Sequence, residues 1–294
     1  MAEPVVEVAG VTKCFGRVCA VDSLSLTVER GESFGFLGPD CGAIRIMGRD
    51  MATESLEAKR HIGLVPDEYG LYDDLTAADH LRFYGALLGL PRSELEGAVE
   101  RSLRAVDLVE QTNTRARGFS HGMRQRLVIA QALMGQPDVL FLDEPTTGLD
   151  PIGAREVRAV IKKMTDSGMT LFISSHLLFE VQEMCRSVGV IHRGRLLRKD
   201  TIENLSTLFK SRMGRQLYLL LQNPSPATYS AVASTPGVES VSMDGPAYRI
   251  RLSDPEAQFR IPHEVLRAGG RIVAYYEVSP SLEDLFMDLI REGR

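Results

Sequence analysis

The sequence lacks the dipeptide Gly-Lys anywhere in its 294 residues. That absence excludes the usual phosphate loop, Gly-x-x-x-x-Gly-Lys-Ser/Thr, whose backbone N–H groups and lysine hold the β- and γ-phosphates of a nucleotide. The nearest segment begins at Gly38, and there Ala43, Ile44 and Arg45 fill the positions of the second Gly, the Lys and the Ser/Thr. The chain therefore offers no complete phosphate loop of its own.

Long apolar runs and an excess of basic residues are also missing. No stretch approaches the ~18 uninterrupted apolar residues of a membrane-spanning helix, and no basic segment with an apolar run opens the chain as in a secretory signal. The formal net charge of -5 argues against nucleic acid as the main partner, since proteins of that class carry a basic patch. We expect a cytoplasmic globular protein that reaches a membrane only through a partner.

Cysteine is scarce, with four residues: Cys14, Cys19, Cys41 and Cys185. None belongs to a Cys-x-x-Cys pair or has a nearby His at metal-site spacing. This pattern predicts reduced thiols that neither bind a metal nor act in catalysis.

The longer, N-terminal part of the chain alternates strand and helix patterns. Alternating apolar residues between Val5 and Val28 predict antiparallel strands around a turn, and the apolar run at 33–38, with its two glycines, predicts a buried strand near a ligand. Helical spacing predicts helices within 75–135, separated at Pro91. A buried strand ending at Leu142, a helix over about 154–167 and a strand at 170–174 follow. This order predicts an α/β fold with a mostly parallel sheet covered on both faces.

The pattern changes near residue 213. Strands at 216–222, 237–243, 247–253 and 271–278 and helices at 226–234 and 255–268 follow the order β-α-β-β-α-β. We therefore predict two domains, 1–212 and 213–294, the second a small α+β ferredoxin-like domain closed by a helix over 281–291.

Two adjacent carboxylates end the buried run that begins at Val139. Ligands of α/β sheets bind beyond the carboxyl ends of the strands, and unpaired charges there are costly. Asp143 is thus a candidate Mg²⁺ ligand, directly or through water, and Glu144 a candidate general base for an attacking water. The alternative is a pair of carboxylates that simply opens a loop.

A second candidate segment is the tract from Phe119 to Leu127, which precedes a helical pattern. Ser120 and Gly122 at a helix N-terminus can offer a hydroxyl, free N–H groups and the positive end of the helix dipole to a phosphate. By itself, the tract favours an ordinary helix cap.

Taken in order, these segments resemble the motifs of an ABC transporter ATP-binding subunit. Ser120-x-Gly122-Met123-x-Gln125-Arg126 resembles the signature and Leu142-Asp143-Glu144-Pro145 the Walker B motif. Gly148-Leu149-Asp150 resembles the D-loop and Ser174-Ser175-His176 the switch histidine. An ordinary helix cap would account for the tract at Ser120, but not for four motifs that follow one another in the family's order. The resemblance implies Mg²⁺ binding by Asp143, catalysis by Glu144 and His176, and ATP contacts by Ser120, Gly122, Met123 and Asp150.

Other segments agree with this resemblance. Phe15, in Lys13-Cys14-Phe15-Gly16, matches the aromatic residue that stacks on adenine, the alternative being a core aromatic. Gly38 matches the first glycine of the phosphate loop. Residues 63–72 resemble the Q-loop, with Asp67 in place of the usual Gln, and residues 280–287 resemble the ending of single-cassette drug and antibiotic exporters.

The resemblance implies a fold, cofactors and partners. The fold is a P-loop NTPase-like ABC cassette with an antiparallel β subdomain and a helical subdomain, followed by the small C-terminal domain. The cofactors are ATP and Mg²⁺, and the implied activity is ATP hydrolysis coupled to drug efflux. A separate membrane permease and a second cassette, identical or different, are the expected partners, with no nucleic acid, at the inner face of the cell membrane.

The sequence departs from the family between Asp40 and Cys41. In the family, a segment resembling Gly38-Pro39 continues into the rest of the loop and a helix before a strand resembling 42–48. Here that strand follows at once, which indicates a loss of about twenty residues and predicts an impaired ATP site. Three interpretations stay open. The chain is a half-competent subunit that completes one of the two ATP sites in an asymmetric pair, or it is a degenerate or damaged relic in which the loss of the helix uncovers apolar surface. The third interpretation is a non-transport ABC protein.

Overall fold

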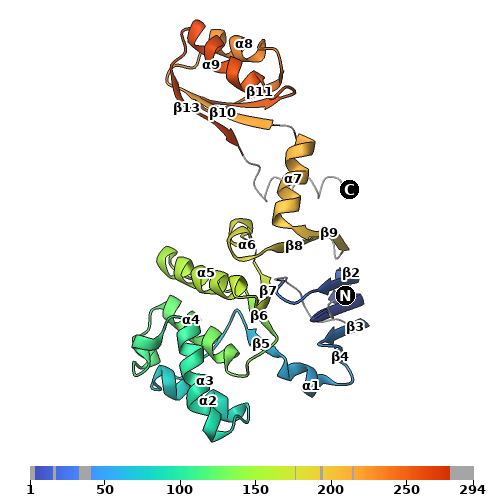
Figure 1. Ribbon diagram of the computed structural model, residues 1–294, viewed down its shortest axis with the longest axis vertical. Helices are drawn as coiled ribbons and strands as arrows, with labels where there is room; N and C mark the ends of the chain where they lie inside the picture. Colours follow the sequence, from blue (N-terminus) through green and yellow to red (C-terminus); the bar gives the residue numbers. More distant parts are fainter. Residues whose placement is uncertain are drawn as a thin grey trace. The chain divides into compact units, whose positions relative to one another are not determined.

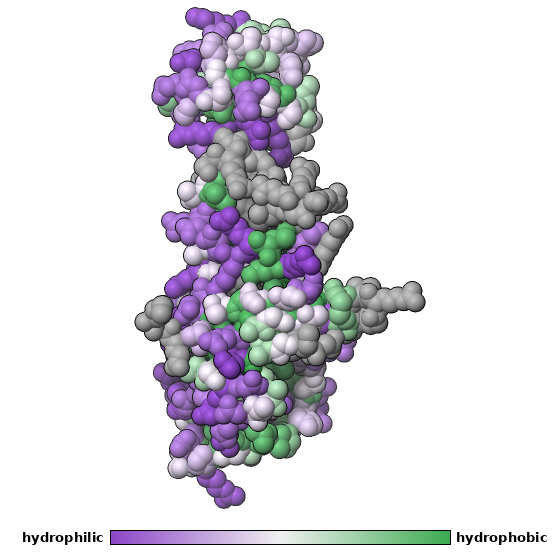
Figure 2. Space-filling view, turned by 90° about the vertical axis from the view of Figure 1, so that its right-hand side faces the viewer, coloured by the Kyte–Doolittle hydropathy of each residue, from purple (hydrophilic) through white to green (hydrophobic). Residues whose placement is uncertain are grey.

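A computed structural model describes residues 4–15, 18–32, 41–175, 177–192, 195–213 and 215–278 (Figure 1). The chain divides into two compact units, one reaching Ile202 and the other beginning at Glu203. In the described part of the chain, no helix is both long and apolar enough to cross a membrane. Hydrophilic residues cover much of the face seen in Figure 2, and apolar side chains show there as separate patches.

The first unit opens with an antiparallel sheet, as the alternating pattern predicts. Its strands are β1 (Val6–Phe15), β2 (Val18–Val28), β3 (Cys41–Ile46) and β4 (Arg49–Asp50), in the order β2-β1-β3-β4. Cys14 on β1 lies opposite Cys19 on β2, and the two form a disulfide. The expectation of reduced thiols was therefore wrong for this pair, because hairpin pairing places side by side two cysteines that sequence spacing does not associate.

Strand β3 contains the residues that fill the last positions of the phosphate-loop motif. Ala43, Ile44 and Arg45 pair with residues 9, 8 and 7 of β1 in antiparallel register. The next helix along the described chain is α1 (Ser55–Arg60), which follows the short strand β4. Ile44 and Arg45 thus lie in a strand and not in a loop that opens a helix.

A parallel sheet forms the middle of this unit. Its strands are β5 (Ile62–Val65), β6 (Val139–Asp143) and β7 (Thr170–Ser174), hydrogen-bonded in that order. An antiparallel pair, β8 (Ser187–His192) and β9 (Arg195–Thr201), follows. The combination of parallel and antiparallel strands agrees with the predicted ABC cassette fold.

Helices cover one side of the parallel strands, and the N-terminal sheet lies on the other (Figure 1). The helices are α2 (Ala77–Leu87), α3 (Arg92–Ala105), α4 (His121–Leu133), α5 (Pro151–Asp166) and α6 (Leu178–Met184), with short 3-10 helices at Val109–Gln111 and Ala116–Gly118. On the other side, Val139 and Phe172 are buried among apolar residues of β1, β2 and β3. Leu64 of β5, which pairs with Phe141 of β6, is 59% exposed, so the antiparallel sheet covers this face only in part.

The second unit has the predicted ferredoxin-like order. After α7 (Ile202–Met213) come β10 (Arg215–Leu221), α8 (Pro226–Ala233), β11 (Val238–Asp244), β12 (Ala247–Leu252), α9 (Ala257–Arg267) and β13 (Ile272–Val278). The sheet order is β11-β12-β10-β13, with every neighbouring pair antiparallel. Alternate β10 residues Leu217, Leu219 and Leu221 are buried against α8 and α9 residues. The predicted helix at 281–291 lies outside the described residues.

Candidate functional site

Asp143 and Glu144 lie at the carboxyl end of β6, the middle strand of the parallel sheet. Asp143 pairs in register with Ser174 at the end of β7, whose hydroxyl donates a hydrogen bond to the Asp143 carboxylate. The same Ser174 Oγ accepts a hydrogen bond of 3.0 Å from the Glu144 backbone N–H, and the Thr147 hydroxyl donates one of 3.1 Å to Glu144 Oε2. Glu144 has a φ of +44°, a conformation that costs a non-glycine residue roughly 1 kcal/mol or more. Two hydroxyls therefore hold both carboxylates in place where the chain leaves the strand.

Asp143 fits a magnesium ion only as a single protein ligand. Its side chain is exposed, and the described residues contain no group of three or more His, Cys, Asp or Glu side chains that could hold a metal. Protein-bound Mg²⁺ commonly takes one or two carboxylates, with phosphate oxygens and water completing the octahedron. The single carboxylate of Asp143 therefore suits a Mg²⁺ ion whose other ligands are water and the phosphate oxygens of a nucleotide.

Ser120 caps the N-terminus of α4. Its Oγ accepts a hydrogen bond of 3.2 Å from the Met123 backbone N–H, and the side chain is exposed. Met123 itself packs against the apolar core of the first unit. The Ser120 hydroxyl donates no hydrogen bond to any residue in the described part of the chain. It can therefore donate one to an anion at the N-terminus of α4.

Asp150 caps α5 in the same way, with Oδ1 accepting a hydrogen bond of 2.9 Å from the Gly153 backbone N–H. A Cβ added to Gly122 would lie only 2.8 Å from Gly153 Cα. The absence of a side chain at Gly122 therefore lets the first turns of α4 and α5 touch. This contact places the Ser120 and Asp150 caps on neighbouring helix ends.

A cavity of about 560 Å³ lies beside these elements. Its lining includes Asp67 after β5, His121 at the start of α4 and Glu144 after β6, while Ser120, Gly122, Met123 and Asp150 are not among its lining residues. The structure thus brings the Q-loop, the signature and the Walker B ends together.

Tyr69 and Arg124 are among the side chains of this cavity that the sequence analysis did not identify as site residues. Arg124 donates hydrogen bonds of 2.8 Å to Asp73 Oδ1 and 3.0 Å to the Ala116 carbonyl, which fix its guanidinium beside the cavity. Burial raises the pKa of Tyr69 despite the opposing charge of Arg124, so its phenol stays neutral. Both residues lie within segments quoted for the family resemblance, and that position is the signal that could have found them.

Three predicted residues cannot be placed in this site. His176 and Gly38 lie outside the described residues. Phe15 ends β1, but its side chain is also outside the described part. Their roles stay predictions.

Comparison with known families identifies the chain. Residues 33–147 match the ABC transporter family, and residues 209–290 match the C-terminal domain of ATP-binding proteins like DrrA1-3. The linearmycin resistance ATP-binding protein LnrL of Bacillus subtilis (strain 168) is 30% identical over 302 aligned positions, which cover 95% of this chain and 96% of that protein. The chain belongs to the ABC transporter ATP-binding proteins.

Other relatives agree with this membership. The bacitracin transport ATP-binding protein BcrA of Bacillus licheniformis is 34% identical over 68% of this chain and 71% of its own length. A solved ATP-binding subunit of an ABC transporter superposes with a TM-score of 0.59 at 26% identity, covering 71% of this chain and 94% of that one. The first unit therefore has the fold and the sequence of an ABC cassette.

Proposed function

We propose that this chain is the energising subunit of an ABC-type exporter of drug-like or antibiotic molecules, bound to a separate permease at the inner face of the cell membrane. The observation that carries the proposal is the contact of α4 with α5, which sets the caps Ser120 and Asp150 on adjacent helix ends beside a cavity lined by Glu144. The names of LnrL and BcrA, which refer to antibiotic resistance and transport, support an exporter.

In this proposal the chain's own ATP half-site is impaired. The pairing of Ile44 and Arg45 with β1 supports this view, because neither residue lies where a lysine or hydroxyl would meet a phosphate. A phosphate loop supplies several charge-assisted hydrogen bonds of about 1.5 to 3 kcal/mol each, whereas millimolar binding needs only about 4 kcal/mol in total. Without the loop, ATP does not stay bound at cellular concentrations.

The chain still carries the groups that act on a nucleotide held by a second cassette. Ser120 and the free N–H groups of α4 would contact its γ-phosphate, and Asp150 would face it from the D-loop. In the chain's own half, Asp143 and Glu144 keep the positions of a magnesium ligand and a general base. A pair of unequal subunits would thus contain one complete site.

The test compares the purified chain with a mixture containing a cassette that has a complete phosphate loop. We expect ATP to leave the melting temperature of the chain alone unchanged, while the mixture hydrolyses ATP. Replacing Ser120→Ala should lower hydrolysis by the mixture about tenfold or more, because it removes a donor to the phosphate.

The matched control is Ser225→Ala. Ser225 caps α8, since its Oγ accepts a hydrogen bond of 3.2 Å from the Thr228 backbone N–H, the same length as the bond that Ser120 Oγ accepts. Both substitutions should cost about 1 kcal/mol of stability, but only Ser120→Ala should reduce hydrolysis. Saturable ATP binding by the chain alone would contradict the impaired site. A folded chain that gives no hydrolysis with any cassette would favour a relic, and recovery of ribosomes or DNA without a permease would favour a non-transport protein.

A further inference from the structure

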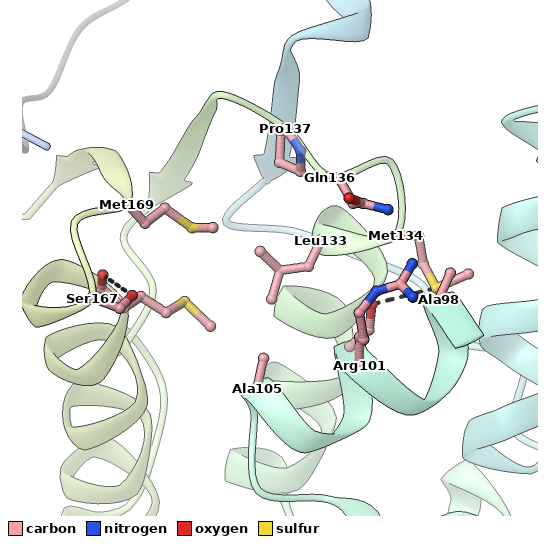
Figure 3. A pocket seen from close by; sticks show the side chains of 11 residues that line it. Ala98, Arg101, Ala105, Leu133, Met134, Gln136, Pro137, Ser167 and Met169 are labelled. Atoms are coloured by element: carbon pink, nitrogen blue, oxygen red, sulfur yellow. Dashed lines mark hydrogen bonds between the residues drawn. The ribbon is translucent and has the colours of Figure 1, made fainter. Parts of the chain in front are cut away.

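A second cavity, of about 310 Å³, lies at the opposite end of β6 from Glu144 (Figure 3). It is bounded by the C-terminal parts of α3 and α4, the end of α5 and the residues that lead into β6. Apolar side chains form much of its wall, among them Leu133, Met134, Met164 and Met169. Methionine is unbranched and polarizable, so a wall with three methionines adapts to apolar ligands of irregular shape.

The polar groups of this cavity divide into satisfied and unsatisfied ones. The Ser102 hydroxyl donates to Met134 Sδ over 3.5 Å, and the Ser167 hydroxyl donates to the Met164 carbonyl over 2.7 Å. Arg101 and Gln136, both exposed, also line the cavity, and neither side chain has a hydrogen bond or ion pair with any residue in the described part of the chain. One turn further along α3, by contrast, Arg104 pairs with Glu100.

Figure 3 shows the Arg101 guanidinium beside Met134, with Gln136 on the same side of the cavity. A guanidinium presents a planar fork of N–H donors that matches the two oxygens of a carboxylate. The lining therefore combines an apolar wall with one exposed guanidinium that has no partner among the residues that the structure describes. Small-molecule sites share this composition, and their volumes begin at about 300 Å³.

We propose that this cavity binds a small amphipathic carboxylate, with its aliphatic chain against the methionines and its carboxylate on Arg101. The volume suits a saturated chain of about eight carbons, and the single guanidinium selects a monoanion over a polyanion such as a nucleotide. This site is separate from the cavity lined by Glu144, and the proposal does not depend on the proposed function.

The test follows the methionine methyl groups of the full chain by NMR during titration with octanoate. The signals of Met134, Met164 and Met169 should shift together and saturate. The methyl signals of Met51, which follows β4, and of Met243 in the second unit should not shift, since neither residue lines the cavity. Single Met→Leu variants assign each signal.

Matched variants and ligands separate the charge from the apolar wall. Arg101→Gln should weaken octanoate binding about tenfold or more, while Arg104→Gln should leave it unchanged. Ala105→Leu, which fills part of the cavity from α3, should abolish the shifts without altering the other methionine signals. Octanol should bind at least about tenfold more weakly than octanoate, and butyrate should not bind measurably.

Several results would overturn the proposal. Equal binding of octanol and octanoate, or an unchanged affinity in Arg101→Gln, would exclude recognition of a carboxylate. Shifts of all methionine signals in parallel would indicate detergent-like action, and an absence of shifts at Met134, Met164 and Met169 would exclude the cavity as a site.

Discussion

Individual carboxylates in this protein are held by neighbours from distant parts of the chain. Asp138 lies directly before β6, where His61 Nδ1 donates to Oδ2 over 2.8 Å and Arg30 donates to Oδ1 over 3.2 Å. Burial alone would raise the pKa of Asp138, but the hydrogen bonds from His61 and Arg30 outweigh it and hold that pKa below its ordinary value of 3.8. The ionised carboxylate therefore ties the N-terminal sheet to the start of the central strand.

Replacing Asp138→Asn should lower the free energy of unfolding at neutral pH by about 1 kcal/mol, since the pair is partly exposed. Because the folded pKa is depressed, the stabilisation is present above the unfolded value of 3.8 and is lost as the pH falls through the folded value. Urea unfolding should therefore show a difference at neutral pH that shrinks below about pH 3.8.

The control for this prediction is Asp74→Asn. Asp74 is exposed and has one bond of 3.3 Å to Arg117, so its removal should change stability little at any pH. A difference between wild type and Asp138→Asn that grew in acid would contradict the prediction.

At the scale of elements, the position of α4 against α5 depends on glycine. Gly122 is buried, and the space for a Cβ there is occupied by backbone atoms of Gly153 at 2.8 to 3.4 Å. Backbone cannot move aside as a flexible side chain can. The close approach of the two helices therefore requires glycine at this point.

Gly122→Ala should lower the free energy of unfolding by about 1 to 3 kcal/mol, the range of overpacked cores, as measured by chemical denaturation. Gly97→Ala is the matched control within α3. A Cβ at Gly97 would meet only the Arg101 Nη1 atom at 3.1 Å, the far end of a flexible side chain. That substitution should raise stability by about 0.5 to 1 kcal/mol, because alanine loses less entropy in a helix. Equal effects of the two substitutions would show that the helix contact is not tight.

Most helices and strands could be predicted from the sequence, and their ends follow from local chemistry. The helix expected from about residue 154 begins at Pro151, because Asp150 caps it and proline suits a first helical position. The disulfide between Cys14 and Cys19 and the packing of β3 on β1 could not be predicted, since each depends on the register between strands. Of the candidate site, the positions of Asp143 and Glu144 at a strand end could be predicted, but the approach of Arg124 to Tyr69 could not.

At the scale of the whole molecule, the two units have separate apolar cores. The core of the second unit consists of residues between Leu217 and Val265, among them the fully buried Tyr248, whose hydroxyl lies 2.9 Å from the Thr228 hydroxyl. The cores of the first unit contain none of these residues. Each unit can therefore lose stability without the other.

Leu219→Ala, which removes a fully buried side chain from β10, should destabilise the second unit by about 2 to 5 kcal/mol. Hydrogen exchange on the full chain should then become faster across 215–278, with rates in 62–174 unchanged. Leu127→Ala on α4 should produce the converse pattern. Faster exchange in both units after either substitution would show that they unfold as one.

The sequence by itself determined the family, the β-α-β-β-α-β order of the second unit, the strand-helix-strand order over residues 139–174 of the first unit, and the placement of Asp143 and Glu144 after a buried strand. Each of these depends on the spacing of residues that are close in the sequence, and that spacing does not depend on how the chain packs. Only the tertiary structure decided that Gly122 meets Gly153, that the antiparallel sheet covers Val139 and Phe172, and that Arg101 lines the same cavity as three methionines. These features join residues far apart in the chain, and long-range packing alone brings them together.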